Sequence, residues 1–352
     1  MTLLHGFALT FLAGLSVGFS GWPIKWARTW KWENFWLIYS FFCLIIFPFG
    51  LAFWLLPHLG RVYASLMPLE ALKPFLFGVL WGFAQLGCGI CIHRLGFAVT
   101  VAVVNGIGAA LGTLIPLVLL HQAMIFQTRG VLILSGTLVM LGGVALCGWS
   151  GYQREDEARR QGRGAGFSVK ESAMSQVAST RAGYILNVGI AVGAGVLASL
   201  LNVALAYGGD IMQNVRLQGG QASWAPFAVW PIALLGGSLV NIAYCVYLLS
   251  HNRTWGNFRG GIKEAFNPAL AGFMWMGGIA LYSSGTTFLG VLGVSIGFGL
   301  YMIMLILSGQ LAAVFTGEWY LTRRVTSGSF GAGIAFLVLA FIAIGAANYM
   351  GK

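Results

Sequence analysis

The sequence predicts an all-α integral membrane protein with ten transmembrane helices, arranged as two inverted five-helix repeats. Three observations lead to this fold class. Hydrophobic residues fill 58% of the 352 positions and charged residues only 8%, whereas a soluble domain carries charges at about a quarter of its positions. The hydrophobic residues form continuous runs of about 20, which is the length of a transmembrane helix. In addition, a signature of five residues occurs twice along the chain.

The apolar runs predict helices rather than the strands of a β-barrel, because barrel strands alternate between apolar and polar positions. The first run is expected to be a retained span, since it lacks the basic segment and the small-residue cleavage site of a signal peptide. The ten expected spans are 2–22, 34–56, 74–92, 97–120, 129–150, 183–206, 224–250, 268–285, 288–315 and 328–350.

The repeated signature begins the third span and returns at the eighth. All five of its residues recur 194 positions later: Pro74, Gly78, Trp81, Leu95 and Gly96 return as Pro268, Gly272, Trp275, Leu289 and Gly290. Five is an odd number of spans, so a duplicated five-span unit enters the membrane upside down. Inverted repeats of this kind are typical of secondary transporters. We therefore expect a first repeat at 1–150, a linker at 151–182 and a second repeat at 183–352.

The distribution of basic residues predicts the orientation. Fifteen of the 20 Lys and Arg residues lie in the loops after the odd-numbered spans. The positive-inside rule assigns these loops, including the linker 151–182, to the cytoplasm and both termini to the outside. The net charge of +11 is thus interpreted as a topology signal. Membrane lipid is the expected surrounding, and no nucleic-acid partner is expected, since the short loops leave no basic domain to read one.

Enzymatic chemistry inside the membrane is not expected. All nine carboxylates lie in loops or at span ends, whereas acid–base or metal catalysis within the membrane needs such a group inside a span. The pair Cys88 and Cys91 is interpreted as packing, because a metal site needs further ligands and no second pair exists. The sequence therefore predicts no enzyme, no cofactor and no metal.

Neutral polar and aromatic residues within the spans favour a neutral sugar as substrate. Amides and phenols pair with sugar hydroxyls, indole rings cover a C–H face, and no counter-ion is needed. The alternative is that these amides bond a neighbouring helix. The predicted substrate-binding residues are Gln85, Asn105, Tyr301, Trp81, Trp275, Tyr282 and Asn202.

Several motifs, in this order, carry a resemblance to a known family. They are Trp30-x-Trp32-Glu33-x-x-Trp36, Leu76-Phe77-Gly78-x-x-Trp81-Gly82, Leu95-Gly96, Gly112-Thr113-Leu114-x-Pro116, Gly236-Gly237 with Asn241, Met274-Trp275 and Glu318-Trp319. Together they resemble the L-rhamnose–proton symporter family, within the drug/metabolite transporter superfamily. The resemblance implies a drug/metabolite transporter-like fold of ten helices with both termini outside. It also implies proton-coupled uptake of L-rhamnose or a related deoxy sugar across the bacterial cytoplasmic (inner) membrane.

The sequence departs from the family in its ninth span. The resemblance implies an acidic residue there, but the stretch GVLGVSIGFGLYM contains none. Proton symport calls for a titratable group in the pathway, and the remaining candidates at span ends are Glu33, Glu318 and His93. The two glutamates also have an ordinary explanation, which is pairing with Lys31, Arg323 or Arg324. The alternative function is therefore a drug/metabolite-transporter-type carrier or exporter of another neutral metabolite, with or without proton coupling.

Overall fold

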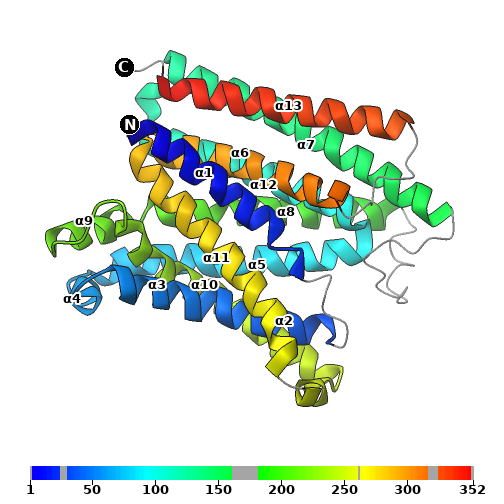
Figure 1. Ribbon diagram of the computed structural model, residues 1–352, viewed down its shortest axis with the longest axis horizontal. Helices are drawn as coiled ribbons and strands as arrows, with labels where there is room; N and C mark the ends of the chain where they lie inside the picture. Colours follow the sequence, from blue (N-terminus) through cyan, green and yellow to red (C-terminus); the bar gives the residue numbers. More distant parts are fainter. Residues whose placement is uncertain (1, 24–29, 161–180, 261, 316–323, 350–352) are drawn as a thin grey trace. The chain divides into compact units, whose positions relative to one another are not determined.

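The computed structural model describes residues 2–23, 30–160, 181–260, 262–315 and 324–349, and all regular structure within these ranges is helical, as predicted (Figure 1). The helices of the first half are α1 (Thr2–Phe19), α2 (Trp32–Phe41), η2 (Phe42–Ile46), α3 (Phe47–Leu55), α4 (Leu59–Ala64), α5 (Pro68–Leu95), α6 (Phe97–Leu120), η3 (Gln122–Met124) and α7 (Thr128–Arg160). Those of the second half are α8 (Arg181–Ala206), α9 (Gly209–Leu217), η5 (Ala225–Ala228), α10 (Val229–His251), η6 (Trp255–Gly260), α11 (Ile262–Phe288), α12 (Gly293–Phe315) and α13 (Arg324–Tyr349).

Helix occupies each of the ten expected spans, and eight of the segments are long and apolar enough to cross a membrane. The apolar part of α1, Leu3–Phe19, is shorter. Helix α11 is not among the eight, and its last two turns carry Tyr282, Ser283, Ser284, Thr286 and Thr287. The number of membrane crossings and the inverted repeat therefore stay predictions.

Three local differences from the predicted elements have simple causes. Helix α7 continues through Arg160, because the charged stretch after the span is rich in good helix formers. The short helices α4 and α9 were not predicted. Helix α9 buries only Ile211 and Val215, which is too weak an apolar pattern to stand out in a polar loop.

Burial raises the pKa of Tyr63 in α4, and its hydroxyl donates to the carbonyl of Ala228 at 2.8 Å.

The helices form two compact units. The first contains residues 1–83 and 200–309, and the second contains residues 84–199 and 310–352. Each unit thus takes helices from both expected repeats. A unit is defined by contacts and a repeat by common origin, so the boundaries of the repeats stay a prediction.

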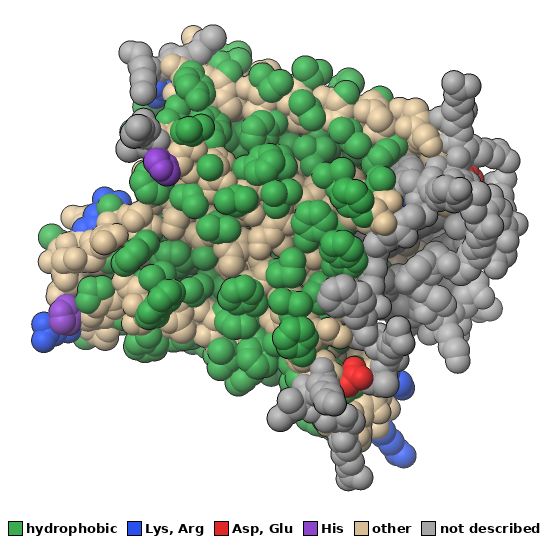
Figure 2. Space-filling model, viewed as in Figure 1, with side chains coloured by type: hydrophobic (Ala, Val, Ile, Leu, Met, Phe, Trp, Pro, Cys, Tyr) green, Lys and Arg blue, Asp and Glu red, His purple; other side chains and the backbone are tan. Residues whose placement is uncertain are grey.

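In the first unit, α1 lies along α11 (Figure 1), and α10 packs against α2 and η2. Glycine permits the close approach of α1 and α11, since a Cβ on Gly278 would lie 2.8 Å from the carbonyl oxygen of Ala13. Such small-residue contacts replace the hydrophobic force that helices lack within lipid. Figure 2 shows hydrophobic side chains over α1 and α11, the surface expected where a helix faces lipid.

In the second unit, α13 lies along α7 (Figure 1), and α6 packs against α7 as well. Glycines again line the contact: a Cβ on Gly143 would lie 2.9 Å from Leu337, and one on Gly333 would lie 2.7 Å from the sulfur of Cys147. These helices therefore pack backbone to backbone with few large side chains between them.

Candidate functional site

A buried group of tyrosine and asparagine side chains lies inside the first unit. The hydroxyl of Tyr282 in α11 donates a hydrogen bond to Oδ1 of Asn202 in α8. The ring of Tyr301 in α12 lies 5.1 Å from that of Tyr282, measured between centroids. All three side chains are at most 4% exposed. Three predicted substrate-binding residues, from three different helices, thus meet in one place.

Two predicted tryptophans also contact each other in this unit. The ring centroids of Trp81 in α5 and Trp275 in α11 are 5.7 Å apart, with the planes tilted by 33°. Trp81 packs on Gly237 of α10, where an added Cβ would lie 2.8 Å from the indole ring. The missing side chain of Gly237 is what admits the large ring at this point.

Helix α2 contributes residues that the sequence reasoning did not select for the site. The indole Nε1 of Trp36 donates to Oδ1 of Asn241 at 3.1 Å, and Nδ2 of Asn241 donates to the carbonyl of Gly237 at 3.0 Å. Asn241 therefore connects Trp36 to the glycine that supports Trp81. The rings of Trp36 and Tyr39 lie 4.8 Å apart. The signal that could have identified them is their helical spacing at the start of the second span.

The backbone of the second span is irregular next to these residues. Phe42–Ile46 form a π-helical turn, η2, and Pro48 follows at the start of α3. Proline lacks an N–H and its ring crowds the preceding turn, so a widened turn relieves both conflicts. Ser40 lies two residues before the start of η2. Its hydroxyl is buried without a hydrogen-bond partner among the described residues. Widened turns of this kind are frequent at functional sites, and a buried hydroxyl without a protein partner is available to bind water or a ligand.

Gln85 and Asn105, the other two predicted residues, belong to the second unit. Both side chains are half-buried. Gln85 follows Trp81 by one turn of α5, just beyond the boundary between the units. Their part in a common site with Tyr301 therefore stays a prediction.

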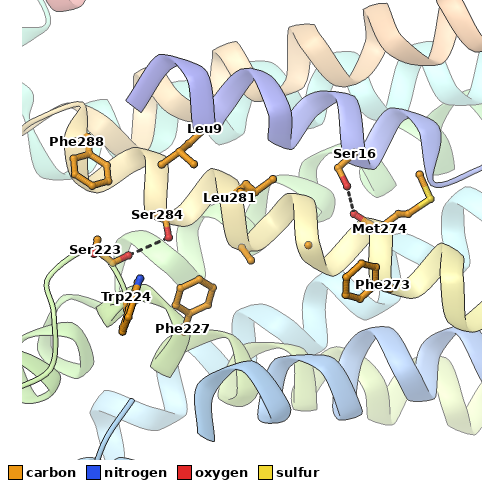
Figure 3. A pocket seen from close by; sticks show the side chains of 12 residues that line it. Leu9, Ser16, Ser223, Trp224, Phe227, Phe273, Met274, Leu281, Ser284 and Phe288 are labelled. Carbon is orange, nitrogen blue, oxygen red and sulfur yellow. Dashed lines mark hydrogen bonds between the residues drawn. The ribbon is translucent and has the colours of Figure 1, made fainter. Parts of the chain in front are cut away.

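A cavity of about 550 Å³ also opens in the first unit, beside α1, α11 and η5 (Figure 3). Its lining is mostly apolar, including Phe227, Phe273 and Leu281. Two of its three serine hydroxyls already donate to backbone carbonyls: Ser16 to Met274 at 2.7 Å and Ser284 to Ser223 at 3.1 Å. No predicted site residue lines it. Such a surface offers few partners for sugar hydroxyls, so the polar aromatic cluster is the better candidate.

Among the coupling candidates, Glu33 at the start of α2 is buried, with 5% of its surface exposed. Its Oε1 accepts hydrogen bonds from Nδ2 of Asn252 at 3.1 Å and from Oγ1 of Thr254 at 2.9 Å. The expected pairing with Lys31 is not what the structure shows, because Lys31 is exposed and both donors to Glu33 are neutral. The hydrogen-bond partners of Glu33 lie in a turn more than 200 residues away in the sequence, and only the tertiary fold brings them to α2.

Comparison with known proteins identifies the family. A model of the L-rhamnose-proton symport protein family matches residues 5–350 of the chain. The chain belongs to this family. The family resemblance predicted from the motifs is thereby confirmed, and the family is one of transporters rather than enzymes.

Three relatives illustrate the extent of the similarity. The L-rhamnose-proton symporter of Mannheimia succiniciproducens is 23% identical over 99% of both chains. The symporter of the same name from Pectobacterium atrosepticum is 24% identical over 90% of both chains. That of Yersinia pestis is 24% identical over 92% of both chains. The similarity therefore extends along at least 90% of the length of each of these bacterial proteins.

A proton symport family calls for a titratable group, and Glu33 is the one charged side chain that is buried among the described residues. Glu318 and the side chain of His93 lie outside the described part of the structure. The assignment of a coupling residue therefore rests, for these two, on sequence alone.

Proposed function

We propose that this protein takes up L-rhamnose, or a closely related deoxy sugar, together with a proton by alternating access. The relatives named L-rhamnose-proton symporters, which match over at least 90% of the chain, support this function. The observation that carries it is the neutral cluster of Tyr282, Asn202 and Tyr301. The paired indoles of Trp81 and Trp275 belong to the same unit, and Trp275 precedes Tyr282 by about two turns of α11. Phenol and amide groups match sugar hydroxyls, and aromatic faces match the C–H face and the methyl group of a deoxy sugar.

Within the first unit, the proposed sugar site contains five of the residues selected from the sequence, extended by Trp36 and Asn241: Trp81, Asn202, Trp275, Tyr282 and Tyr301. Gln85 and Asn105 of the second unit are proposed as sugar-binding residues from the sequence alone. Because Tyr282 and Asn202 are each 1% exposed, a sugar reaches them only when the surrounding helices move apart. Motion of two inverted repeats about a central site supplies such an opening on alternate sides.

Contacts within the first unit support the inverted repeat. Trp81 and Trp275 are equivalent positions in the two expected repeats, and they contact each other. Two equivalent residues touch when they lie at the two-fold axis that relates their repeats. The equivalent glycines also contact equivalent spans: Gly78 approaches α10 in the seventh span, and Gly272 approaches η2 in the second.

We further propose a location in the bacterial inner membrane with both termini outside. The test uses two exposed positions, Gly256 in the short helix η6 and Gln221 in a loop, each replaced by cysteine. A membrane-impermeant thiol reagent applied to intact cells should label Gln221→Cys and spare Gly256→Cys. Labelling in the opposite sense would reverse the orientation.

The function is tested by uptake of labelled L-rhamnose into cells that express the protein, with external pH followed in weak buffer. We expect saturable uptake, alkalinisation of the medium and loss of accumulation with an uncoupler. Gln85→Ala, Asn105→Ala and Tyr301→Phe should each weaken uptake several-fold, because each removes a hydrogen bond of about 0.5–1.5 kcal/mol. Sugar uptake without a pH change would leave a neutral-metabolite carrier and exclude symport.

A further inference from the structure

Four hydrogen bonds join the start of α2 to the turn that follows α10. Two of them end on Glu33, from Asn252 at 3.1 Å and from Thr254 at 2.9 Å. Asn34 makes the other two: its Nδ2 donates to the carbonyl of Thr254 at 3.0 Å, and its Oδ1 accepts from Nδ2 of Asn257 at 3.2 Å. We call these five residues the α2–α10 latch.

The latch is largely sealed from water at its centre. Glu33, Asn34 and Thr254 are 5%, 0% and 4% exposed. The turn that they hold contains Arg253 with φ of 53°, a left-handed conformation that is unfavourable for a side chain other than glycine. Because bonds to Asn252 and Thr254 flank Arg253, they maintain a turn that the chain does not favour by itself.

The latch acts on the helices that build the proposed sugar site. Trp36 lies three residues after Glu33, about 4.5 Å farther along α2, and donates to Asn241 of α10. The same two helices are thus joined twice, at the sugar cluster and at the latch. Release of the latch frees the start of α2 from the end of α10, two ends that the proposed topology assigns to the cytoplasm.

The charge of Glu33 sets the strength of the latch. Hydrogen bonds to an ionised acceptor are roughly twice as strong as neutral ones, so protonation of the carboxylate weakens both bonds to it.

The elements packed against this end of α2 carry other charged or titratable groups. In α10 these are Cys245, which is buried, and Tyr244, whose ring lies 6.4 Å from that of Trp32. The other such groups among the side chains that the structure describes are Lys31, His251 and Arg253, which are exposed, Tyr247, which stacks on His251, and Glu264 of α11.

We propose that Glu33 carries the transported proton and that its protonation opens the α2–α10 latch. The carboxylate holds the cytoplasmic end of the transporter shut. A proton that enters with the sugar converts the Glu33 carboxylate to the neutral acid, and the hydrogen bonds from Asn252 and Thr254 weaken. Once this end has opened, the proton leaves Glu33 for the cytoplasm, and the restored carboxylate closes the latch again. This inference rests on the proposed function, because it assigns the coupled proton to a residue.

The first test measures opening directly in purified protein reconstituted in lipid. Spin labels on Lys31→Cys and Gly256→Cys, two exposed positions beside the latch, report the distance across it. The protein labelled without introduced cysteines gives the background. We expect the population at longer distance to grow several-fold as pH falls. In Glu33→Gln that population should be present at every pH.

The matched control is Glu70→Gln. Glu70 also lies in the first turn of a helix, but its carboxylate accepts an exposed bond from the backbone of Met67 at 2.9 Å. This variant should behave like the unaltered protein. A distance distribution that does not change with pH, or a pH response that survives in Glu33→Gln, would overturn the proposal.

A second test locks the latch. Asn34→Cys with Asn257→Cys places two thiols where two side chains now share a hydrogen bond. Oxidation should abolish L-rhamnose uptake and reduction should restore it, while each single variant is insensitive to the oxidant. Normal uptake by the oxidised double variant would show that the latch need not open.

The two proposals fail in different ways. If purified protein binds no L-rhamnose, the proposed function fails, and the distance measurement still decides the latch. If L-rhamnose enters with a proton and Glu33→Gln remains fully coupled, the function stands and the assignment of Glu33 is wrong.

Discussion

The two copies of the repeated signature share their residues but not their surroundings. A Cβ added to Gly78 in the first copy would overlap the carbonyl oxygen of Ala233, whereas one added to Gly272 would lie 3.2 Å from the nearest atoms of Cys43. Trp81 is 6% exposed, and Trp275 is only half-buried. The first copy is thus packed tightly against its partner helix and the second more loosely. In a transporter of two inverted repeats, one conformation places equivalent contacts in unequal states, since only one side is open at a time.

The residues proposed to bind the sugar lie at positions where the two copies of the repeat differ. At the offset of 194 residues, Tyr282 corresponds to Cys88 and Tyr301 to Ile107. Gln85 corresponds to Ile279 and Asn105 to Gly299. The shared positions are glycine, proline, leucine and tryptophan, which shape the packing of helices. The two copies of the signature thus share packing residues, whereas the side chains proposed to bind the sugar occur in only one copy.

The largest difference is expected when the two signature glycines are replaced by alanine. Gly78→Ala forces a methyl group into a backbone carbonyl, so we expect a loss of more than about 3 kcal/mol and little folded protein. Gly272→Ala needs a shift of only a few tenths of an ångström, and alanine favours the helix by about 1 kcal/mol, so its stability should change little. Thermal unfolding in detergent, with folded yield from size-exclusion chromatography, measures both.

The control for this pair is Gly277→Ala on α11, where nothing lies within 4 Å of an added Cβ. It should be neutral or slightly stabilising. Equal losses in Gly78→Ala and Gly272→Ala would contradict the unequal packing of the two copies.

A smaller difference is expected between the two tyrosines of the sugar cluster. Tyr282→Phe removes the hydroxyl that donates a hydrogen bond to Asn202, and each of these two side chains is only 1% exposed. We expect a loss of about 1–3 kcal/mol, because buried polar groups that lose a partner cost this much. Tyr301→Phe keeps its ring contact with Tyr282 and should change stability less while weakening L-rhamnose binding. Thermal unfolding and equilibrium binding of labelled sugar separate the two effects, and a larger stability loss in Tyr301→Phe would reverse the assignment.

The sequence predicts most of the helices and only part of the site, for physical reasons. Long apolar runs can satisfy their backbone in lipid only as helices, so the segments at 97–120 and 183–206 match α6 and α8 closely. Tyr282, Tyr301 and Asn202 could be selected because polar groups inside apolar spans stand out. The partners of Glu33 could not, because Asn252 and Thr254 lie in an ordinary polar turn and only tertiary folding brings them to α2. Sequence proximity favoured Lys31 instead.

The smallest expected effect distinguishes the two signature tryptophans. Trp81→Phe empties part of a closely packed site against Gly237, and we expect it to cost about 1–3 kcal/mol. Trp275→Phe should cost less than about 1 kcal/mol, since its side chain is half-buried and the smaller ring still faces Trp81. Both variants retain an aromatic face for the sugar, so a shared reduction in L-rhamnose affinity would come from the lost indole surface. Unfolding temperatures and binding isotherms of the two purified variants measure these effects. If Trp275→Phe were the less stable of the two variants, the second copy would be packed more tightly around its tryptophan than the first. The unequal packing inferred from the two signature glycines would then not extend to the two tryptophans.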